Sequence, residues 1–361
     1  MDTTGLALKP EERILFQLRE LYQRFGYALF KMSKFEEYDL YVQNKEFLVS
    51  DGIITFTDTD GRLMALKPDV TLSIIKNTQH LPGDLKKLYY NENVYRLSGN
   101  THSFKEIMQT GLECIGDVDL YQLCEVISLA DSSLQIISRD HILVLSHMGV
   151  VSSIVDSLCP NTEQRRRLLA CIGKKDADGI RKLFPHSDLG GIMALIAAHG
   201  SPAHVLETIS PWCKNSVGRV AIDELSAVCS ILTANGCENI DLDFSVVNDM
   251  NYYNGIVFQG YIKGIPTSVL SGGQYDKLMQ RVGQGKHAVG FAIYMDQLER
   301  LKSESSPYDI DTLLLYDDDT DISLLMREVR RLTASTSGVM ARKSIPEKLR
   351  YRRLVNMTKG A

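Results

Sequence analysis

The sequence of 361 residues lacks several features that would assign it to a function class directly. Its seven cysteines form no Cys-x-x-Cys pair and its eight histidines are scattered, so no metal site is expected. No apolar run approaches the roughly 18 residues that cross a bilayer, and Met1–Glu12 does not have the basic and then apolar regions of a signal segment. We therefore expect a cytoplasmic protein with reduced thiols, no cofactor and no membrane partner.

An excess of positive charge is also missing. Forty Lys and Arg residues stand against 45 Asp and Glu residues, which gives a formal net charge of −5 at pH 7. Proteins whose main task is to bind nucleic acid usually carry a basic excess, so nucleic acid is not expected as a principal partner. The shares of hydrophobic residues (44%) and charged residues (24%) are typical of a globular protein long enough for two or three domains.

The short motifs of many enzyme classes are absent. The sequence contains no P-loop, no Gly-x-Ser-x-Gly, no His-Glu-x-x-His and no Gly-x-Gly-x-x-Gly after a predicted strand. A functional site would therefore be built from residues that the fold brings together.

Hydrophobic periodicity predicts an α+β protein. Apolar residues recur at helical spacing in some stretches and alternate with polar residues in others. The predicted elements are a helix over 10–25, a hairpin of 53–56 and 63–66, long strands over 85–96 and 104–116, a helix over 123–137, strands within 240–270 and a helix over 275–282. The stretch of about 152–235 is almost wholly helical in pattern, and we interpret it as an insertion into a core of residues 1–302.

A small C-terminal module is predicted after this core. Residues 303–306 are rich in serine and are interpreted as a linker to an α/β module over 307–361. Within it, strands are predicted at Leu313–Tyr316 and Gly338–Arg342, with a helix over Asp321–Leu332 between them.

Charge is unevenly distributed in this module. Residues 309–321 contain six Asp and no basic residue, whereas residues 342–359 contain seven Lys or Arg and one Glu. Clusters of this kind usually form a solvated surface, and the alternative is a docking surface for another protein.

One predicted strand carries a polar strip. Alternate residues of a strand share a face, so Gln109, Gly111 and Glu113 are expected to lie together. Glycine has no Cβ, and a ligand could approach the backbone at Gly111. Glu113 could accept a hydrogen bond from an ammonium or imidazole N–H, and Gln109 could bind a carboxylate or an amine. An ordinary solvent-facing strand is the alternative.

Two further clusters favour a ligand site. Lys67–Thr71 places the Asp69 carboxylate and the Thr71 hydroxyl after a turn fixed by proline. In Asn251–Gly255, strand alternation would put Tyr252 and Tyr253 on opposite faces, so that one of them could cap an aromatic ligand. Core packing is the alternative for the two tyrosines.

Taken together in chain order, these segments resemble the catalytic core of the histidyl-tRNA synthetases, which are class II synthetases. The resemblance covers about residues 5–300 and rests on Leu66-Lys67-Pro68-Asp69-Val70-Thr71, Asn93-Val94-Tyr95-Arg96, Met108-Gln109-Thr110-Gly111-Leu112-Glu113, Asp249-Met250-Asn251-Tyr252-Tyr253-Asn254-Gly255, Ser271-Gly272-Gly273-Gln274-Tyr275-Asp276 and Gly290-Phe291-Ala292. It implies an antiparallel sheet flanked by helices, with 152–235 as the family's helical insertion. It also implies a histidine-binding pocket made of Asp69, Thr71, Arg96, Gln109, Glu113, Tyr252 and Tyr253.

The sequence departs from the synthetase pattern at residues that serve amino-acid activation. Family synthetases carry arginines that meet the aminoacyl phosphate and the ATP phosphates, and the matching positions here hold Asn248, Gln274 and Gln297. Ser33 replaces the proline of the family's first motif, which belongs to the dimer-forming segment. The C-terminal tail is also shorter than an anticodon-binding domain. Activation of histidine is therefore not expected, and no catalytic residue is assigned.

A synthetase core with these losses resembles the ATP phosphoribosyltransferase regulatory subunits. That resemblance implies a non-catalytic subunit that forms a dimer, binds L-histidine and assembles with the short-form catalytic subunit of the first enzyme of histidine biosynthesis. Two alternatives stay open: a histidine-activating enzyme of the synthetase type, and an RNA-binding sensor derived from a synthetase.

Overall fold

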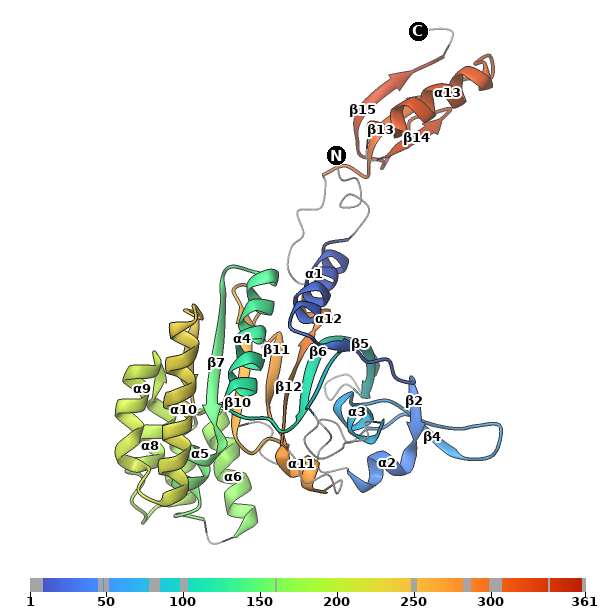
Figure 1. Cartoon of the computed structure of the whole chain (residues 1–361). Helices are drawn as coiled ribbons and strands as arrows, with labels where there is room; N and C mark the ends of the chain where they lie inside the picture. Colours follow the sequence, from blue (N-terminus) through green and yellow to red (C-terminus); the bar gives the residue numbers. More distant parts are fainter. Residues whose placement is uncertain are drawn as a thin grey trace. The chain divides into compact units, whose positions relative to one another are not determined.

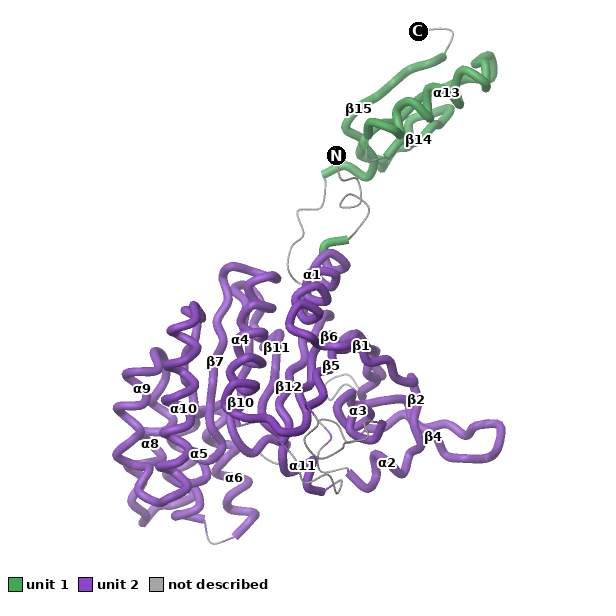
Figure 2. The backbone as a smooth tube through the Cα atoms, viewed as in Figure 1, with its two compact units in different colours: residues 1–10, 302–361 green, residues 11–301 purple. Residues whose placement is uncertain are grey.

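The computed structural model describes residues 9–44, 48, 52–77, 85–97, 103–159, 161–247, 252–281, 287–298, 307–336 and 338–358. The chain divides into two compact units, one of residues 11–301 and the other of residues 1–10 and 302–361 (Figure 2). Among the described residues, no helix has the length and apolar character needed to cross a membrane.

A nine-stranded sheet forms the centre of the larger unit (Figure 1). The strands lie in the order β1 (Ala28–Leu29), β5 (Leu85–Leu97), β6 (Phe104–Gly116), β12 (His287–Tyr294), β11 (Leu270–Gln274), β10 (Ile256–Ile262), β7 (His141–His147), β9 (Ile240–Asp243) and β8 (His199–Gly200). Neighbouring strands are antiparallel except for the pairs β1–β5 and β7–β9, which are parallel. The predicted antiparallel sheet is thus confirmed, with two parallel pairs toward its edges.

Helix α4 (Leu120–Ile137) packs against strands β7, β10 and β12. It begins at a capping box in which Asp119 accepts from the backbone N–H of Gln122, while the Gln122 side chain accepts from the N–H of Asp119. Leu112 and Cys114 of β6 belong to the same hydrophobic core as the buried side of α4. This core therefore fixes the opposite face of β6, with Gln109 and Glu113, toward the other side of the sheet.

A smaller three-stranded sheet supports that other side. It consists of β2 (Phe35–Glu37), β4 (Leu63–Leu66) and β3 (Thr55–Thr57), and β3 and β4 form the predicted hairpin. The short helices α2 (Tyr38–Gln43) and α3 (Thr71–Asn77) lie close by in the chain, and their buried side chains share a second core with Tyr252 and Tyr275.

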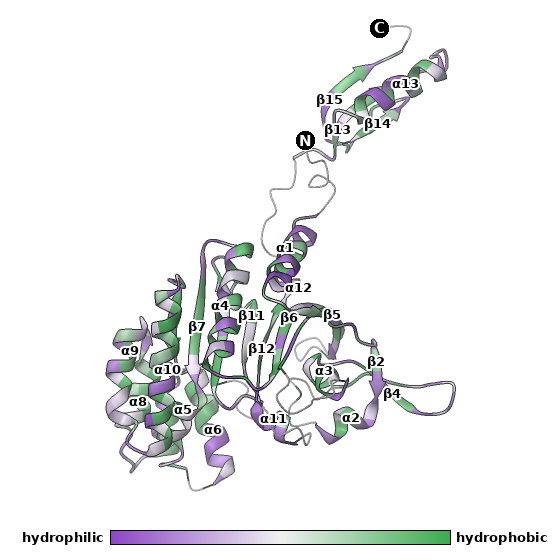
Figure 3. Ribbon diagram, in the orientation of Figure 1, coloured by the Kyte–Doolittle hydropathy of each residue, from purple (hydrophilic) through white to green (hydrophobic). Residues whose placement is uncertain are grey.

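Residues 148–234 are mainly helical, as the sequence pattern predicts. They contain α5 (Met148–Val155), α6 (Thr162–Gly173), α7 (Ala177–Leu183), α8 (Gly190–Ala197), α9 (Pro202–Ile209), a 3₁₀ turn (Ser210–Trp212) and α10 (Ser216–Ala234). Helix α8 is largely hydrophobic in Figure 3, and three of its residues are buried in the main core. The remaining helices of this unit are α1 (Pro10–Arg24), α11 (Asp276–Arg281) and α12 (Met295–Leu298).

The smaller unit contains a parallel sheet of three strands. Strand β13 (Ile310–Leu315) lies between β14 (Val339–Arg342) and β15 (Tyr351–Asn356), and α13 (Ile322–Thr333) connects β13 to β14. The two predicted strands and the helix are present, whereas β15 was not predicted from the sequence. The predicted linker at 303–306 lies outside the described residues.

The uneven charges of this unit partly neutralise each other. Arg350 donates to Asp309 (2.9 Å), Arg352 lies 3.7 Å from Asp311, and Lys343 pairs with Asp318. Because β15 lies beside β13, residues of the basic segment come next to residues of the acidic one. The two clusters are therefore neighbours in the fold and not two separate surfaces.

Candidate functional site

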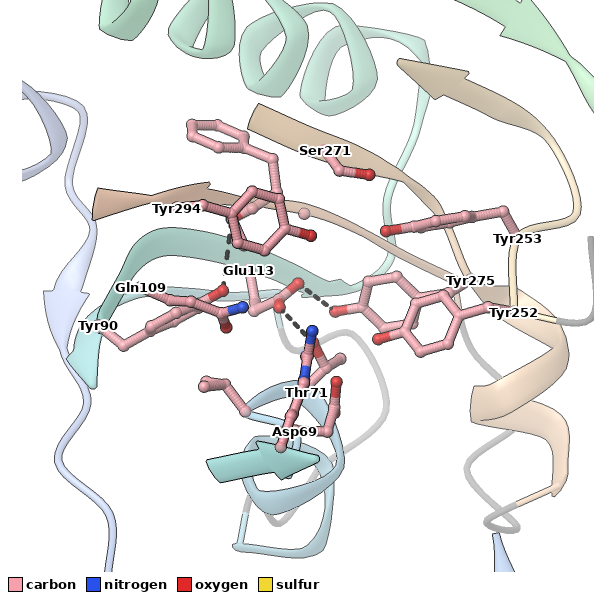
Figure 4. A pocket seen from close by; sticks show the side chains of 15 residues that line it. Asp69, Thr71, Tyr90, Gln109, Glu113, Tyr252, Tyr253, Ser271, Tyr275 and Tyr294 are labelled. Carbon is pink, nitrogen blue, oxygen red and sulfur yellow. Dashed lines mark hydrogen bonds between the residues drawn. The ribbon is translucent and has the colours of Figure 1, made fainter. Parts of the chain in front are cut away.

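A pocket lies against the face of the sheet opposite α4, between strand β6, the start of α3 and the segment before β10 (Figure 4). Its empty space is about 520 Å³, part of it open to solvent. All seven predicted binding residues line this pocket: Asp69, Thr71, Arg96, Gln109, Glu113, Tyr252 and Tyr253. The structure thus brings together residues that are up to 184 positions apart in the sequence (69 to 253).

Glu113 lies at the centre of the pocket in Figure 4 and is only 2% exposed. One carboxylate oxygen accepts from the Thr71 hydroxyl at 2.8 Å, and the other accepts from the Tyr275 hydroxyl at 2.6 Å. Burial disfavours the charged form and raises the pKa of Glu113 to about 8, although both hydrogen bonds act in the opposite direction. The carboxyl group is therefore held in one orientation and exchanges a proton close to neutral pH.

Asp69 joins the pocket to helix α3. Pro68 fixes the turn before the helix, and the Asp69 carboxylate accepts from the backbone N–H of Leu72 at 2.9 Å, as a side chain at a helix N-terminus does. Burial raises the pKa of Asp69, while the hydrogen bond from Leu72 and the charge of Arg96 lower it. Thr71, the first residue of α3, directs its hydroxyl to Glu113.

Arg96 lies at the end of β5 and donates from Nε to the carbonyl oxygen of Pro68 at 2.8 Å. This bond ties the guanidinium to the turn that carries Asp69. Among the described residues that line the pocket, Arg96 is the only lysine or arginine. A single fixed cation therefore faces at least two carboxyl groups.

The placement of the two tyrosines differs from the prediction. Tyr252 and Tyr253 both line the pocket, with ring centroids 4.7 Å apart, and do not lie on opposite faces of a strand. Strand β10 begins only at Ile256, so both tyrosines belong to a turn in which strand alternation does not apply. Tyr252 also packs on Tyr275, with 5.7 Å between the ring centroids. The turn thus makes one aromatic wall.

The expected opening at Gly111 is also wrong. A Cβ at this position would lie 2.1 Å from the carbonyl oxygen of Phe291 and 2.7 Å from the hydroxyl of Tyr90. Tyr90 is paired with Gly111 across β5 and β6, and its side chain takes up the space that the missing Cβ leaves. Gly111 therefore serves the packing of Tyr90 and does not admit a ligand to the backbone.

Several lining residues were not predicted as site residues. They are Val70, Tyr90, Ser271 and Tyr275, together with the strand β12 residues Gly290, Phe291, Ala292 and Tyr294. Tyr275 is the most important, because it holds Glu113. Its sequence signal is its place in Ser271-Gly272-Gly273-Gln274-Tyr275-Asp276, one of the segments that carry the resemblance.

Comparison with known proteins gives the family of this architecture. The family model for histidyl-tRNA synthetase matches residues 6–298. The chain belongs to the histidyl-tRNA synthetase family.

Curated relatives of the chain carry a different name from the synthetases. A protein from Alkaliphilus metalliredigens is 28% identical over 310 residues, which cover 81% of this chain and 78% of the relative, and is named ATP phosphoribosyltransferase regulatory subunit. A protein of the same name from Bacillus subtilis is 27% identical over 327 residues, with 87% of this chain and 83% of the relative covered.

Solved structures show that the histidyl-tRNA synthetase-like fold extends over most of the chain. An ATP phosphoribosyltransferase regulatory subunit/histidyl-tRNA synthetase from Bacillus halodurans has a TM-score of 0.75 at 22% identity, with 97% of this chain and 94% of that chain covered. A chain of an ATP phosphoribosyl transferase complex from Thermotoga maritima has a TM-score of 0.64 at 20% identity, with coverages of 79% and 97%. A histidyl-tRNA synthetase from Nostoc reaches 0.65 at 16% identity, with coverages of 96% and 87%. The class II synthetase fold expected from the sequence is confirmed.

Proposed function

We propose that this chain is a non-catalytic regulatory subunit of an ATP phosphoribosyltransferase and acts in the first step of histidine biosynthesis and in its feedback regulation by histidine. Support comes from the curated relatives of that name, which match about four fifths of the chain. The observation that carries the proposal is the chemistry of the pocket: it has a complete set of polar groups for an amino acid, with one arginine among its described lining residues.

The ligand that suits these groups is L-histidine. Glu113, already oriented by Thr71 and Tyr275, accepts from an imidazole N–H, and the ring stacks in the wall of Tyr252 and Tyr253. Asp69, Thr71 and Gln109 hold the α-ammonium group. Arg96 pairs with the carboxylate, and its bond to Pro68 keeps the guanidinium in place.

The same lining suits a nucleoside triphosphate poorly. Each charge-assisted hydrogen bond to phosphate contributes about 1.5–3 kcal/mol, and loss of one group that stabilises developing charge typically slows a reaction by about 10²–10³. Two of the three glutamine or asparagine replacements lie within the described residues. Gln274 accepts from the N–H of Ile256 at 2.6 Å and Gln297 accepts from Thr267 at 3.0 Å, so neither amide lines the pocket. Asn248 lies outside the described residues.

Regulation then follows from a shift between two populations. Histidine stabilises one arrangement of the core, and a partner that prefers the same or the opposite arrangement responds. Such coupling is typically about 1–3 kcal/mol and is reciprocal. If histidine changes the affinity of this chain for the catalytic subunit by some factor, the catalytic subunit must change the affinity of this chain for histidine by the same factor.

Self-association as a dimer is part of the proposal. Helix α1 and the residues after it expose three large apolar side chains, Phe16, Phe25 and Leu29, each more than 40% exposed. Sedimentation of the purified chain tests this: a dimer in the wild type and a monomer for Phe16→Glu are expected. A monomeric wild type would contradict it.

Two measurements test the proposed function. Calorimetry of the chain with L-histidine, alone and with the short-form ATP phosphoribosyltransferase of the same organism, should give heat of binding and a changed histidine affinity in the complex. No heat in either case would remove the histidine-sensing role. Histidine-dependent exchange between ATP and pyrophosphate should stay at background, and measurable turnover would favour a histidine-activating enzyme instead.

A further inference from the structure

A second and larger concavity lies in the same unit, lined by residues near the start of α4, by helix α10 and by residues at the ends of β11 and β12. Its empty space is about 1210 Å³, part of it open to solvent, compared with about 520 Å³ for the pocket around Glu113, and the two share no lining residue. Leu120 of α4 and Val220 of α10 line it and are 43% and 66% exposed. We call it the α4–α10 cleft. It is an open surface with large apolar side chains at its edge.

Helix α10 carries a stripe of residues whose middle three, Val220, Glu224 and Ala227, line the cleft. Val217, Val220, Glu224, Ala227 and Ile231 follow one another at intervals of three, four, three and four positions, the spacing with which one helix packs along another. The core-facing residues of α10 form a different stripe of Gly218, Ala221, Leu225, Val228 and Leu232. Val217, Val220 and Ile231 are 58%, 66% and 37% exposed. The first stripe is therefore available to a second helix.

The cleft is also acidic. Four carboxyl side chains line it (Asp119, Asp223, Glu224 and Asp276), and no lysine or arginine is among its described lining residues. Asp119 caps α4, and Asp276 accepts from the backbone N–H of Ala288 at 3.0 Å. Hydrogen bonding to His147, at 3.0 Å, lowers the pKa of Glu224, which is therefore ionised at neutral pH. Asp223 is exposed on the same side of the helix.

These charges decide which occupant fits. In a helix pair formed with a second copy of this chain, Glu224 is the middle residue of the stripe and would face Glu224 of the partner subunit in either orientation. Such like-charge contact is unfavourable. The negative charge equally disfavours nucleic acid. The occupant that fits both the apolar stripe and the negative charge is an amphipathic helix of another protein. Its apolar face would contact Val217, Val220 and Ile231, and a lysine or arginine would lie opposite Asp223 and Glu224.

We propose that the α4–α10 cleft is the docking surface for the catalytic subunit, which inserts a helix of this chemistry. This inference rests on the proposed function, because it takes its partner from there. It adds the surface, the element that enters it and the sign of the charge that the partner must carry.

The test compares two arginine substitutions on one helix. Val220→Arg introduces a positive charge at the edge of the cleft, whereas Thr233→Arg introduces the same charge on an exposed position of α10 outside the stripe. Asp223→Lys reverses a charge of the cleft. Affinity for the short-form catalytic subunit of the same organism is measured at low and at physiological salt. Val220→Arg and Asp223→Lys should each weaken it by more than about tenfold, and Thr233→Arg by less than about twofold.

Two further measurements keep the result interpretable. Thermal unfolding and histidine affinity of each variant should match the wild type, because Val220, Asp223 and Thr233 are exposed and lie outside the histidine pocket. Hydrogen exchange of the unmodified chain should show residues 217–231 protected when the catalytic subunit is added.

Each outcome decides one of the two proposals. A wild type that does not bind the catalytic subunit defeats the proposed function, and the docking surface falls with it. The docking surface is overturned, and the proposed function stays intact, if the wild type binds and all three variants keep its affinity within about twofold. The same conclusion follows if Thr233→Arg lowers the affinity as much as Val220→Arg does. Protection from hydrogen exchange in other segments, with none over residues 217–231, would also overturn the docking surface.

Discussion

Two glutamates of the larger unit illustrate how differently its two concavities are built. Glu113 is buried, receives hydrogen bonds only from hydroxyl groups, and has a pKa raised to about 8. Glu224 is about one third exposed and receives a hydrogen bond from His147, which lowers its pKa. At neutral pH the first is largely protonated and the second is ionised. A buried carboxyl group whose hydrogen-bond donors are neutral hydroxyls suits a small ligand that brings its own charge, whereas an open, ionised surface suits a large and basic partner.

The largest expected effect separates the two concavities by function. At pH 8.5, above the pKa of about 8, Glu113 is largely ionised, and Glu113→Gln should weaken L-histidine binding by about 100-fold, near the upper end of the 1.5–3 kcal/mol that a hydrogen bond to a charged group contributes. Affinity for the catalytic subunit in the absence of histidine should not change, because Glu113 does not line the α4–α10 cleft. Calorimetry measures both.

The matched control for this variant is Glu106→Gln. Glu106 lies on the same strand, is exposed and accepts from Asn93 and Tyr95 outside the pocket. It should bind histidine as the wild type does. Equal loss in both variants, or loss in neither, would contradict the assigned role of Glu113.

The second prediction concerns Arg96, the cation of the pocket. The wild type should prefer L-histidine over histidinol, which lacks the carboxylate, by about 10-fold or more, because a charge-assisted pair contributes about 1.5–3 kcal/mol. Arg96→Met should bind both ligands equally and weakly. Lys105→Met, at the position paired with Arg96 on the neighbouring strand, serves as control and should keep the preference. An unchanged preference in Arg96→Met would place the carboxylate elsewhere.

A third, smaller effect contrasts the walls of the two concavities. Gly111→Ala would push a Cβ against the Phe291 carbonyl and the Tyr90 hydroxyl, and overpacking of this kind costs about 1–3 kcal/mol. Val220→Ala trims an exposed side chain of the α4–α10 cleft and should change the free energy of unfolding by less than about 0.5 kcal/mol. Urea unfolding of both variants measures the difference. Equal free energies of unfolding for the two variants would mean that the pocket wall accommodates the added Cβ without strain.

A fourth effect, spread over several pH units, is a slope in stability with pH. Between about pH 4.5 and 8, folded Glu113 keeps a proton that the unfolded chain has released. The free energy of unfolding should therefore fall as pH rises through this window, by at most about 1.4 kcal/mol per pH unit. Glu224 has the opposite effect and at lower pH. Because its pKa is lowered in the fold, it stabilises the folded state at pH values above the pKa of a glutamate in the unfolded chain, and this contribution is lost on acidification. Urea unfolding from pH 4.5 to 8 should show a flatter slope for Glu113→Gln and an unaltered slope for Glu224→Gln. The opposite pattern would contradict the assignment.

Much of the fold follows from local patterns in the sequence, and six of the seven proposed binding residues lie in segments that these patterns favour as a ligand site. Arg96 and the set of seven as a whole follow only from the resemblance to the histidyl-tRNA synthetases. Alternation along β6 is enough to place Gln109 beside Glu113, because the other face of that strand is plainly apolar. What the patterns miss depends on contacts between distant segments. The space at Gly111 is filled by Tyr90 from the neighbouring strand, which no pattern around Gly111 indicates.

The remaining errors have equally local causes. Tyr252 and Tyr253 precede β10, which begins at Ile256, so the alternation of side chains along a strand does not extend to them. Strand β15 is not predicted from the sequence because Arg352 and Arg353 interrupt its apolar alternation. Two adjacent charged residues indicate a solvent-exposed segment more than a strand of a sheet. Its pairing with β13 is visible only once the acidic and basic segments lie side by side.

The Asp69 carboxylate has a consequence for how occupancy of the pocket could be transmitted. One oxygen of this carboxylate already accepts from the backbone N–H of Leu72 in the first turn of α3, so a ligand ammonium bound to Asp69 would act on a group that holds the start of this helix. Leu72, Ile74 and Ile75 of that helix are completely or almost completely buried in the second core. A movement of the first turn of α3 would thus displace the side chains packed around it. This helix of seven residues would connect the ligand to the second core.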